Sequence, residues 1–248
     1  MNRLAKKKIL VLVEGEKTDV FVMETLLKTY PELDAKYQIV PYCTNIYTLY
    51  HAFFSGADTD DTLDLLQVLK EKERDPNRKK QLDNKYTDIL LIFDLDPQDN
   101  LFTGEKIRQM QAYFCESSDM GKLYLNYPMI ESFFHMKSLP DNEYHNRTVH
   151  MDVLKSHRYK ERVHHESYKK DHRKFITSRA ELNYVIRENA KKASKLTNTT
   201  DSADDYTEID LEAVLEKQLT FLQYDYLQVL CTCILYIFDY NRNLLFAD

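Results

Sequence analysis

Glycine and proline are distributed unevenly along this 248-residue chain, and their distribution limits the folds available to it. All four glycines and all six prolines lie in the first 140 residues, and none follows Pro140. Because these two residues interrupt regular structure most strongly, a long segment without them that is rich in Lys, Glu, Leu and Tyr is typical of helices. The sequence therefore predicts a mainly helical region over residues 136–248, after a first region of different character.

The first region, residues 1–135, alternates short apolar runs with helical patterns. The apolar runs cover residues 8–13, 38–42, 88–93 and 122–127, and the helical patterns cover residues 18–29, 45–55, 62–73 and 104–116. Apolar runs separated by helices are typical of a parallel sheet that helices cover on both faces. We expect an open α/β sheet here, with the highly charged segment 70–85 in solvent.

The helical region has three parts of different composition. A basic segment covers residues 150–175, a polar loop covers 194–206, and a final helix is expected over 207–239. The end of this final helix is apolar almost all round, and such a helix is either buried or forms an interface. A homo-oligomer or a partner protein bound through this helix is therefore one expectation.

Charge and hydropathy argue against several classes of protein, namely nucleic-acid-coating, secreted and membrane-spanning proteins. The formal net charge of −6 argues against a protein that coats nucleic acid through bulk charge, but it leaves room for a local basic patch. The basic first residues precede too few apolar residues for a signal peptide, and the longest apolar run, 227–238, is too short to cross a bilayer. We expect a cytoplasmic protein without membrane attachment. Its four cysteines form no disulfide framework, which predicts reduced residues of the core: Cys43, Cys115, Cys231 and Cys233.

Carboxylates follow two of the predicted strands. Glu14 ends the first apolar run, and Asp94 and Asp96 end the third. In an extended chain residues two apart face the same way, and in open α/β sheets ligands bind at the carboxyl ends of the strands. Grouped carboxylates repel one another unless a cation lies among them, and Mg²⁺ prefers oxygen ligands. The sequence therefore predicts one or two Mg²⁺ or Mn²⁺ ions held by these residues.

The segments "VLVEGEKTDVFV" and "LLIFDLD" resemble the Toprim domain, the metal-binding unit shared by topoisomerases, bacterial primases and OLD-type nucleases. That family places Glu and Gly after its first strand and Asp-x-Asp after its third, which here are Glu14, Gly15, Asp94 and Asp96. The resemblance covers roughly residues 7–130. It implies a magnesium-dependent nuclease with these carboxylates as metal ligands.

Two further segments are similar to a narrower group of Toprim proteins. "VEGEKTD" and "NYPMIESFFH" resemble segments of the RloB and AbiL type, and a related Toprim protein, the AriB effector of the PARIS antiphage system, acts on tRNA under control of a partner ATPase. The chain departs from RloB at Tyr127, where that group has Asn before its proline. The resemblance implies an antiphage effector that acts on tRNA, other RNA or DNA, with an ATPase as a partner.

Each of the other candidate residues has a functional and a structural interpretation. The resemblance makes Asp19 a ligand of a second metal, whereas a carboxylate at that position also stabilises a helix dipole. Lys17 either stabilises charge on the scissile phosphate or is solvated, and Glu131 either supports the site or is paired within the core. For Glu14 the alternative is a helix cap, and for the two aspartates it is a turn over "DPQDN".

The basic segment has three interpretations. On one continuous helix its histidines would share a face with Glu161 and Tyr168, and His at i and i+4 can bind zinc. A solvated basic face is the second interpretation. The third is a nucleic-acid surface, because Lys and Arg bind phosphates. The residues expected to bind nucleic acid are Arg158, Lys160, Arg162, Lys169, Lys170, Arg173 and Lys174.

Two other functions compete with the nuclease. Phosphatases of the haloacid dehalogenase type also have Asp-x-Asp after a strand, but their pair follows the N-terminal strand, whereas here Asp94 follows the third and Pro97 comes soon after. A non-catalytic protein with a Toprim fold would instead act as a regulatory or binding subunit of an ATPase complex, through the apolar C-terminal helix.

Overall fold

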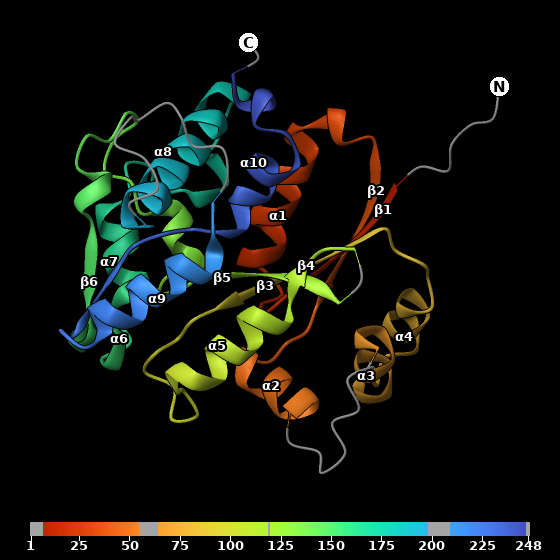
Figure 1. The fold of residues 1–248 in the computed structure, drawn as a ribbon. Helices are drawn as coiled ribbons and strands as arrows, with labels where there is room; N and C mark the ends of the chain where they lie inside the picture. Colours follow the sequence, from red (N-terminus) through yellow and green to blue (C-terminus); the bar gives the residue numbers. More distant parts are fainter. Residues whose placement is uncertain (1–6, 55–63, 119, 198–208, 247–248) are drawn as a thin grey trace. The chain divides into compact units, whose positions relative to one another are not determined.

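The computed structural model describes residues 7–54, 64–118, 120–197 and 209–246. The chain divides into two compact units, the first made of residues 1–93 and 105–124 and the second of residues 94–104 and 125–248. Five strands form one sheet in the order β2-β1-β3-β5-β4, and two further strands, β6 and β7, pair separately (Figure 1). A mostly parallel sheet flanked by helices, together with a mainly helical C-terminal region, confirms the predicted α/β fold class.

The central strands of the five-stranded sheet are continuous apolar runs. β1 (Lys7–Val13) pairs in parallel with β2 (Ala35–Pro41) on one side and with β3 (Asp88–Asp94) on the other. Side chains from Ile9 to Val13 are at most 1% exposed, as expected for strands that are covered on both faces. β5 (Gly121–Asn126) continues the sheet, and the short β4 (Cys115–Glu116), which the sequence did not predict, pairs with it in antiparallel direction.

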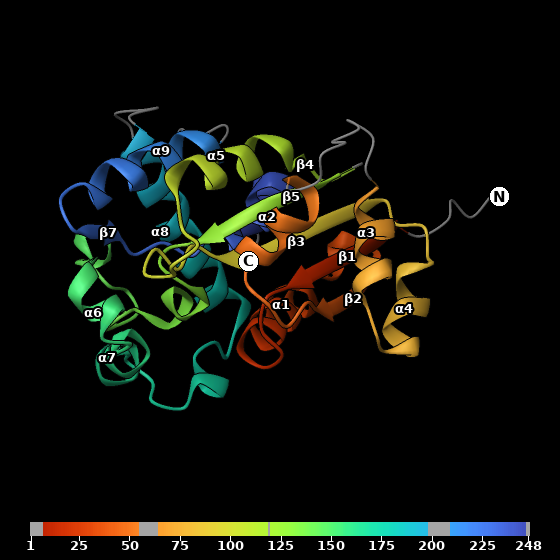
Figure 2. The same cartoon turned by 90° about the horizontal axis from the view of Figure 1, so that it is seen from below.

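Helices cover both faces of the strands in the first unit. Figures 1 and 2 place α1 on one side of β1 and β2, with α2 and α3 on the other. The helices of this unit are α1 (Thr18–Thr29), α2 (Ile46–Phe54), α3 (Leu65–Lys72), α4 (Pro76–Leu82) and α5 (Gly104–Tyr113). The helix predicted over 62–73 thus begins at Leu65, and residues 62 and 63 lie outside the described residues.

The charged segment 70–85 contains a helix, which corrects the expectation of a wholly solvated run. Asp75 caps α4, since its Oδ1 accepts the backbone N–H groups of Asn77 and Arg78 at 2.7 and 3.3 Å. Pro76 occupies the first helical position, where its missing N–H costs nothing. Leu82 at the end of α4 is 4% exposed. One buried side chain among many charges was too weak a pattern to predict this helix.

The second unit contains the helical region and a small sheet. Strand β6 (Thr148–His150) pairs with β7 (Tyr226–Gln228) in antiparallel direction. The longer helices are α6 (Met151–Lys155), α7 (Tyr159–Glu166), α8 (Arg179–Thr197), α9 (Leu211–Leu222) and α10 (Tyr236–Asn241). Its short 3-10 helices include η2 (Ile130–Phe134), η4 (His172–Lys174) and η5 (Cys233–Leu235). The predicted polar loop lies outside the described residues from 198 to 206, and its first residues end α8.

The prediction of a single helix over residues 207–239 is wrong. Its first two residues lie outside the described residues, and the remainder forms α9, β7, η5 and α10 in succession. Asp225 has a φ of 61° between α9 and β7. The amide of Gln218 then binds both backbone groups of Gln228, accepting the N–H at 3.0 Å and donating to the carbonyl at 2.9 Å. Tertiary contacts therefore override the helical composition.

The apolar end of this segment is part of the core. From Val229 to Phe238 every side chain is at most 6% exposed. Between the two interpretations of an all-round apolar helix, burial within the unit accounts for these residues. Association of copies through the C-terminal region stays a prediction.

Two of the four cysteines are where the sequence placed them. Cys231 and Cys233 are buried with their sulfur atoms 3.4 Å apart, whereas Cys43 and Cys115 are exposed, and none of the four forms a disulfide. The expectation that all of them belong to the core is therefore wrong for two. No helix in the described part of the chain is long and apolar enough to cross a membrane.

Candidate metal centre

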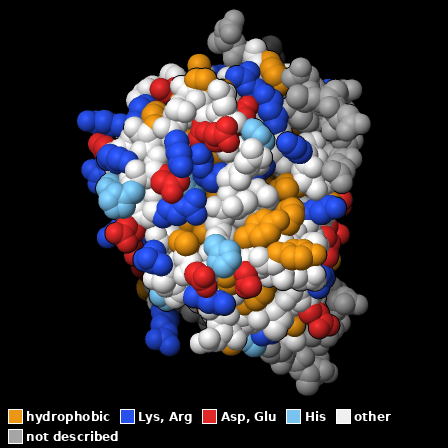
Figure 3. Space-filling model, turned by 90° about the vertical axis from the view of Figure 1, so that its left-hand side faces the viewer, with side chains coloured by type: hydrophobic (Ala, Val, Ile, Leu, Met, Phe, Trp, Pro, Cys, Tyr) orange, Lys and Arg blue, Asp and Glu red, His pale blue; other side chains and the backbone are white. Residues whose placement is uncertain are grey.

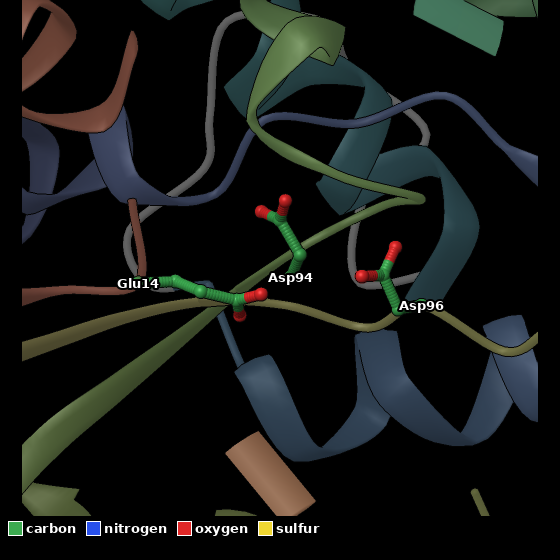
Figure 4. A group of neighbouring side chains, drawn as sticks. All are labelled: Glu14, Asp94 and Asp96. Atoms are coloured by element: carbon green, nitrogen blue, oxygen red, sulfur yellow. The ribbon is translucent and has the colours of Figure 1, made fainter. Parts of the chain in front are cut away.

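The three predicted carboxylates lie together. Glu14, Asp94 and Asp96 each offer a ligand atom, and these atoms are within 4.8 Å of one another (Figure 4). Strand pairing explains the arrangement, because the N–H of Glu14 donates to the carbonyl of Ile92 at 3.1 Å, and Asp94 ends the same strand two residues later. Parallel neighbouring strands thus bring their carboxyl ends to one edge. Binding of a metal there stays a prediction.

Asp94 is held by the segment that follows β5. Its Oδ1 accepts the backbone N–H of Ile130 at 2.8 Å, and the residue is 8% exposed. The N–H groups of Leu95 and Asp96 both donate to the carbonyl of Pro128, at 3.1 and 3.3 Å. Leu95 is fully buried, as its alternation with the two aspartates predicts. The "YPMIES" segment therefore fixes the position of the Asp-x-Asp pair.

Asp96 does not lie in an extended chain, which corrects the geometry assumed from the sequence. Its φ is 40°, and its Oδ1 accepts a hydrogen bond from Nε2 of Gln98 at 3.0 Å. Burial raises the pKa of Asp96, and the bond from Gln98 and the charge of Lys160 offset part of this rise. Asp99 belongs to the turn, since its Oδ1 accepts the N–H of Leu101 at 2.7 Å. The turn interpretation therefore describes Asp99 and the backbone of Asp96, whose carbonyl accepts the N–H of Asp99 at 2.9 Å, while the carboxylate of Asp96 belongs to the group of three.

Gly15 allows the side chain of Asp19 to lie close to the backbone. A Cβ atom at this position would lie 2.6 Å from Oδ2 of Asp19, in the first turn of α1. Asp19 is 5% exposed and lies outside the group of three carboxylates defined by the 4.8 Å limit. Its role as a ligand of a second metal stays a prediction. Lys17 is exposed at the start of α1, and its neighbour Glu16 is paired with Arg78 at 3.2 Å.

The structure pairs a different lysine with the acidic residues. Nζ of Lys160, on α7, lies 3.0 Å from Oε1 of Glu131, on η2. Burial lowers the pKa of Lys160, but the charges of Glu131, Asp94 and Asp96 outweigh this effect and raise it. The sequence predicted Lys160 only as a nucleic-acid-binding residue. No periodic signal links two residues so far apart in the chain.

The basic segment is not one helix, so its histidines do not share one helical face. α7 ends at Glu166, and η4 begins at His172 after an irregular stretch. No group of three or more His, Cys, Asp or Glu ligands other than the carboxylate group occurs among the described residues, and the zinc interpretation gains no support.

Several basic side chains of this segment are engaged within the unit. Arg162 is paired with Glu166 at 2.8 Å and Lys169 with Glu181 at 3.4 Å. Figure 3 views the molecule from the side on which Figure 1 shows α6 and α7, and Lys and Arg are frequent there with acidic residues between them. Contact with nucleic acid stays a prediction. The exposed members of the predicted set are Arg158, Lys160, Lys170, Arg173 and Lys174.

His135 is a buried residue of the second unit with both ring nitrogens bonded. Its Nδ1 lies 3.0 Å from the hydroxyl of Tyr159, and its Nε2 lies 3.1 Å from Oε2 of Glu166. Burial lowers the pKa of His135 to about 4. The ring is therefore neutral at pH 7, and the consistent tautomer donates from Nε2 to the carboxylate and accepts from the hydroxyl.

Acidification is expected to destabilise the protein through His135. Because its folded pKa of about 4 lies below the ordinary value of 6.5, the unfolded state binds the proton first, and stability is lost as pH falls from 6.5 through 4. The loss amounts to about 3 kcal/mol. Urea unfolding between pH 7 and pH 4 measures it, and His135→Gln should remove this component of the pH dependence. The same pH dependence in both proteins would contradict the assignment.

Glu166 makes a separate contribution to the pH dependence of stability, at lower pH. Burial raises the pKa of Glu166, but hydrogen bonds from Arg162 and His135 outweigh it and lower the pKa to about 2. The contribution of this carboxylate is therefore lost between its ordinary value of 4.5 and about 2, mostly below the window of His135.

The donor set of the carboxylate group determines which ligand suits it. It offers only carboxylate oxygens, which suit hard cations such as Mg²⁺ and Mn²⁺. Comparisons of the chain with known protein families, curated proteins and solved structures gave no match.

Proposed function

We propose that the protein is a nuclease of the Toprim type that uses Mg²⁺ or Mn²⁺ to hydrolyse phosphodiester bonds in RNA or DNA. The observation that carries the proposal is the grouping of Glu14, Asp94 and Asp96 within 4.8 Å at the ends of two adjacent parallel strands. Three carboxylates at this distance repel one another, and a divalent cation would relieve the repulsion.

The roles of the residues follow from how they are held. Glu14, Asp94 and Asp96 would bind one or two ions, with Asp19 as a further ligand from α1. The N–H of Ile130 keeps the carboxylate of Asp94 in one orientation, at 2.8 Å. When bound, such an ion activates the attacking water and stabilises the leaving oxygen.

The substrate is a polyanion, which the acidic edge itself repels. Exposed basic residues of the segment 158–174 would attract its phosphates and position the strand. Arg158, Lys170, Arg173 and Lys174 are available for this role because each is exposed. By the resemblance to antiphage Toprim proteins, we further propose a defence effector, located in the cytoplasm and restrained by an ATPase partner.

The proposal predicts metal-dependent cleavage of nucleic acid by the purified protein. tRNA, single-stranded DNA and plasmid are incubated with Mg²⁺, with Mn²⁺ or with a chelator, and cleavage is followed on gels. Glu14→Gln is expected to lower the rate at least about 100-fold, because even residues that only support metal ligands cost up to that factor. Glu16→Gln is the matched control, since Glu16 is exposed and paired with Arg78.

Each other result of this assay favours a different function. Hydrolysis of small phosphate esters alone would identify a phosphatase instead. Absence of metal-dependent hydrolysis on every substrate would favour a non-catalytic subunit of an ATPase complex. Cleavage that Glu14→Gln leaves unchanged would contradict the site.

A further inference from the structure

Glu131 is a buried carboxylate with an incomplete set of partners. Its side chain is 7% exposed, whereas that of its partner Lys160 is 67% exposed. Oε1 of Glu131 meets the ammonium of Lys160 at 3.0 Å. The second oxygen, Oε2, is buried and has no hydrogen-bond partner within the described part of the chain.

A contribution to folding stability does not explain why Glu131 and Lys160 are paired in this way. An ion pair whose lysine is mostly exposed contributes little to folding. A buried carboxylate oxygen without a hydrogen bond is unfavourable, because its desolvation is not compensated. A buried carboxylate oxygen that the protein leaves without a hydrogen bond marks a place where water, an ion or a ligand binds.

The pair is linked to the metal centre by a chain neighbour and by electrostatic interactions. Glu131 follows Ile130, whose N–H holds Asp94 at 2.8 Å. The ammonium of Lys160 interacts electrostatically with both Asp94 and Asp96, and Glu131 interacts with Asp96. All these residues belong to the second compact unit. The ammonium of Lys160 is therefore paired with Glu131, and two further carboxylates act on it electrostatically.

We propose that Lys160 is a phosphate-binding residue of the metal centre and that Glu131 is the residue that positions it. Without metal, the ammonium is the resident cation of the acidic group. With a divalent ion held by Asp94 and Asp96, Lys160 would bind a non-bridging oxygen of the substrate phosphate. Glu131 keeps the ammonium at this place and orients it. This inference rests on the proposed nuclease function.

The opposite charges of the two residues give opposite effects on metal affinity. Lys160 repels a divalent cation, so Lys160→Met should tighten Mn²⁺ binding roughly threefold. Glu131 attracts the cation, so Glu131→Gln should weaken Mn²⁺ binding by a similar factor. Hydrolysis should nevertheless fall in both variants, by about 100-fold for Lys160→Met, because the phosphate loses a charged donor. An ion pair without a phosphate contact would shift Mn²⁺ affinity by its charges alone and would leave hydrolysis at saturating Mn²⁺ unchanged.

The experiment measures Mn²⁺ binding by calorimetry and cleavage of tRNA or DNA with the full chain. Lys155→Met and Glu161→Gln are matched controls, since Lys155 is exposed on α6 and Glu161 is a 66% exposed residue of α7. Lys160→Arg, which keeps the charge, should restore part of the hydrolysis. Lys160→Met leaves the buried carboxylate of Glu131 without its counter-charge, so the thermal unfolding of this variant is compared with that of Lys160→Arg, which keeps the charge.

Two outcomes separate this inference from the proposed function. If Glu14→Gln abolishes hydrolysis but Lys160→Met leaves both Mn²⁺ affinity and hydrolysis unchanged, the role of Lys160 is refuted and the nuclease proposal stands. If the unsubstituted protein cleaves no nucleic acid, the nuclease function and the phosphate contact both fail. Opposite shifts in Mn²⁺ affinity would then still place Lys160 and Glu131 at the metal centre.

Discussion

Replacing Asp94 with asparagine is expected to abolish metal-dependent hydrolysis while leaving the protein folded and at least as stable. The carbonyl oxygen of asparagine can still accept the N–H of Ile130, which lies 2.8 Å from Oδ1 in the unsubstituted protein. The change removes one charge from three carboxylates grouped within 4.8 Å, and this relieves repulsion in the metal-free state. Loss of function together with a gain of stability is typical of catalytic carboxylates.

Two measurements check the prediction for Asp94→Asn. The rate of cleavage should fall about 1,000-fold, or roughly 4 kcal/mol in activation free energy. Thermal unfolding should show that Mn²⁺ stabilises the unsubstituted protein but not the variant, because a ligand stabilises only the state that binds it. Asp99→Asn is the control, since Asp99 forms part of the turn. Cleavage by Asp94→Asn at the unsubstituted rate would refute the metal centre.

The second large effect is on folding and concerns a buried ion pair. Oδ2 of Asp141 lies 2.6 Å from a guanidinium nitrogen of Arg147, with side chains 3% and 4% exposed. The same nitrogen donates to the carbonyl of His135 at 2.8 Å, and the buried ammonium of Lys192 donates to the carbonyls of Tyr144 and Arg147. Asp141→Asn leaves the guanidinium without its counter-charge. We expect the free energy of unfolding to fall by about 3–5 kcal/mol.

Urea denaturation at neutral pH measures this loss. Asp152→Asn is the control, because Asp152 is 79% exposed, and its change should stay within about 0.5 kcal/mol. The double variant Asp141→Leu with Arg147→Met should be less destabilised than Asp141→Asn, because it removes both charges together. A loss below about 1 kcal/mol in Asp141→Asn would show that water or another group compensates Arg147.

Much of the secondary structure of the first unit could be predicted, because the sequence patterns that indicate it extend over only a few neighbouring residues. The apolar runs that became β1 and β3 are covered on both faces, and this burial is visible in their composition. Parallel strands place their carboxyl ends at one edge, so residues as distant in sequence as Glu14 and Asp94 could be expected to meet. The α4 helix could not be predicted, since its one buried residue, Leu82, lies among charges.

The sequence by itself determined the α/β class, the central strands and the grouping of three carboxylates. Only the tertiary structure decided that the final helix is broken, where the amide of Gln218 binds the backbone of Gln228. It also decided that Lys160, rather than Lys17, is the lysine paired at the acidic edge, through Glu131. The physical reason is the same in both cases. Periodicity and strand ends are properties of neighbouring residues, whereas the partner of a buried polar group depends on which distant segment packs against it.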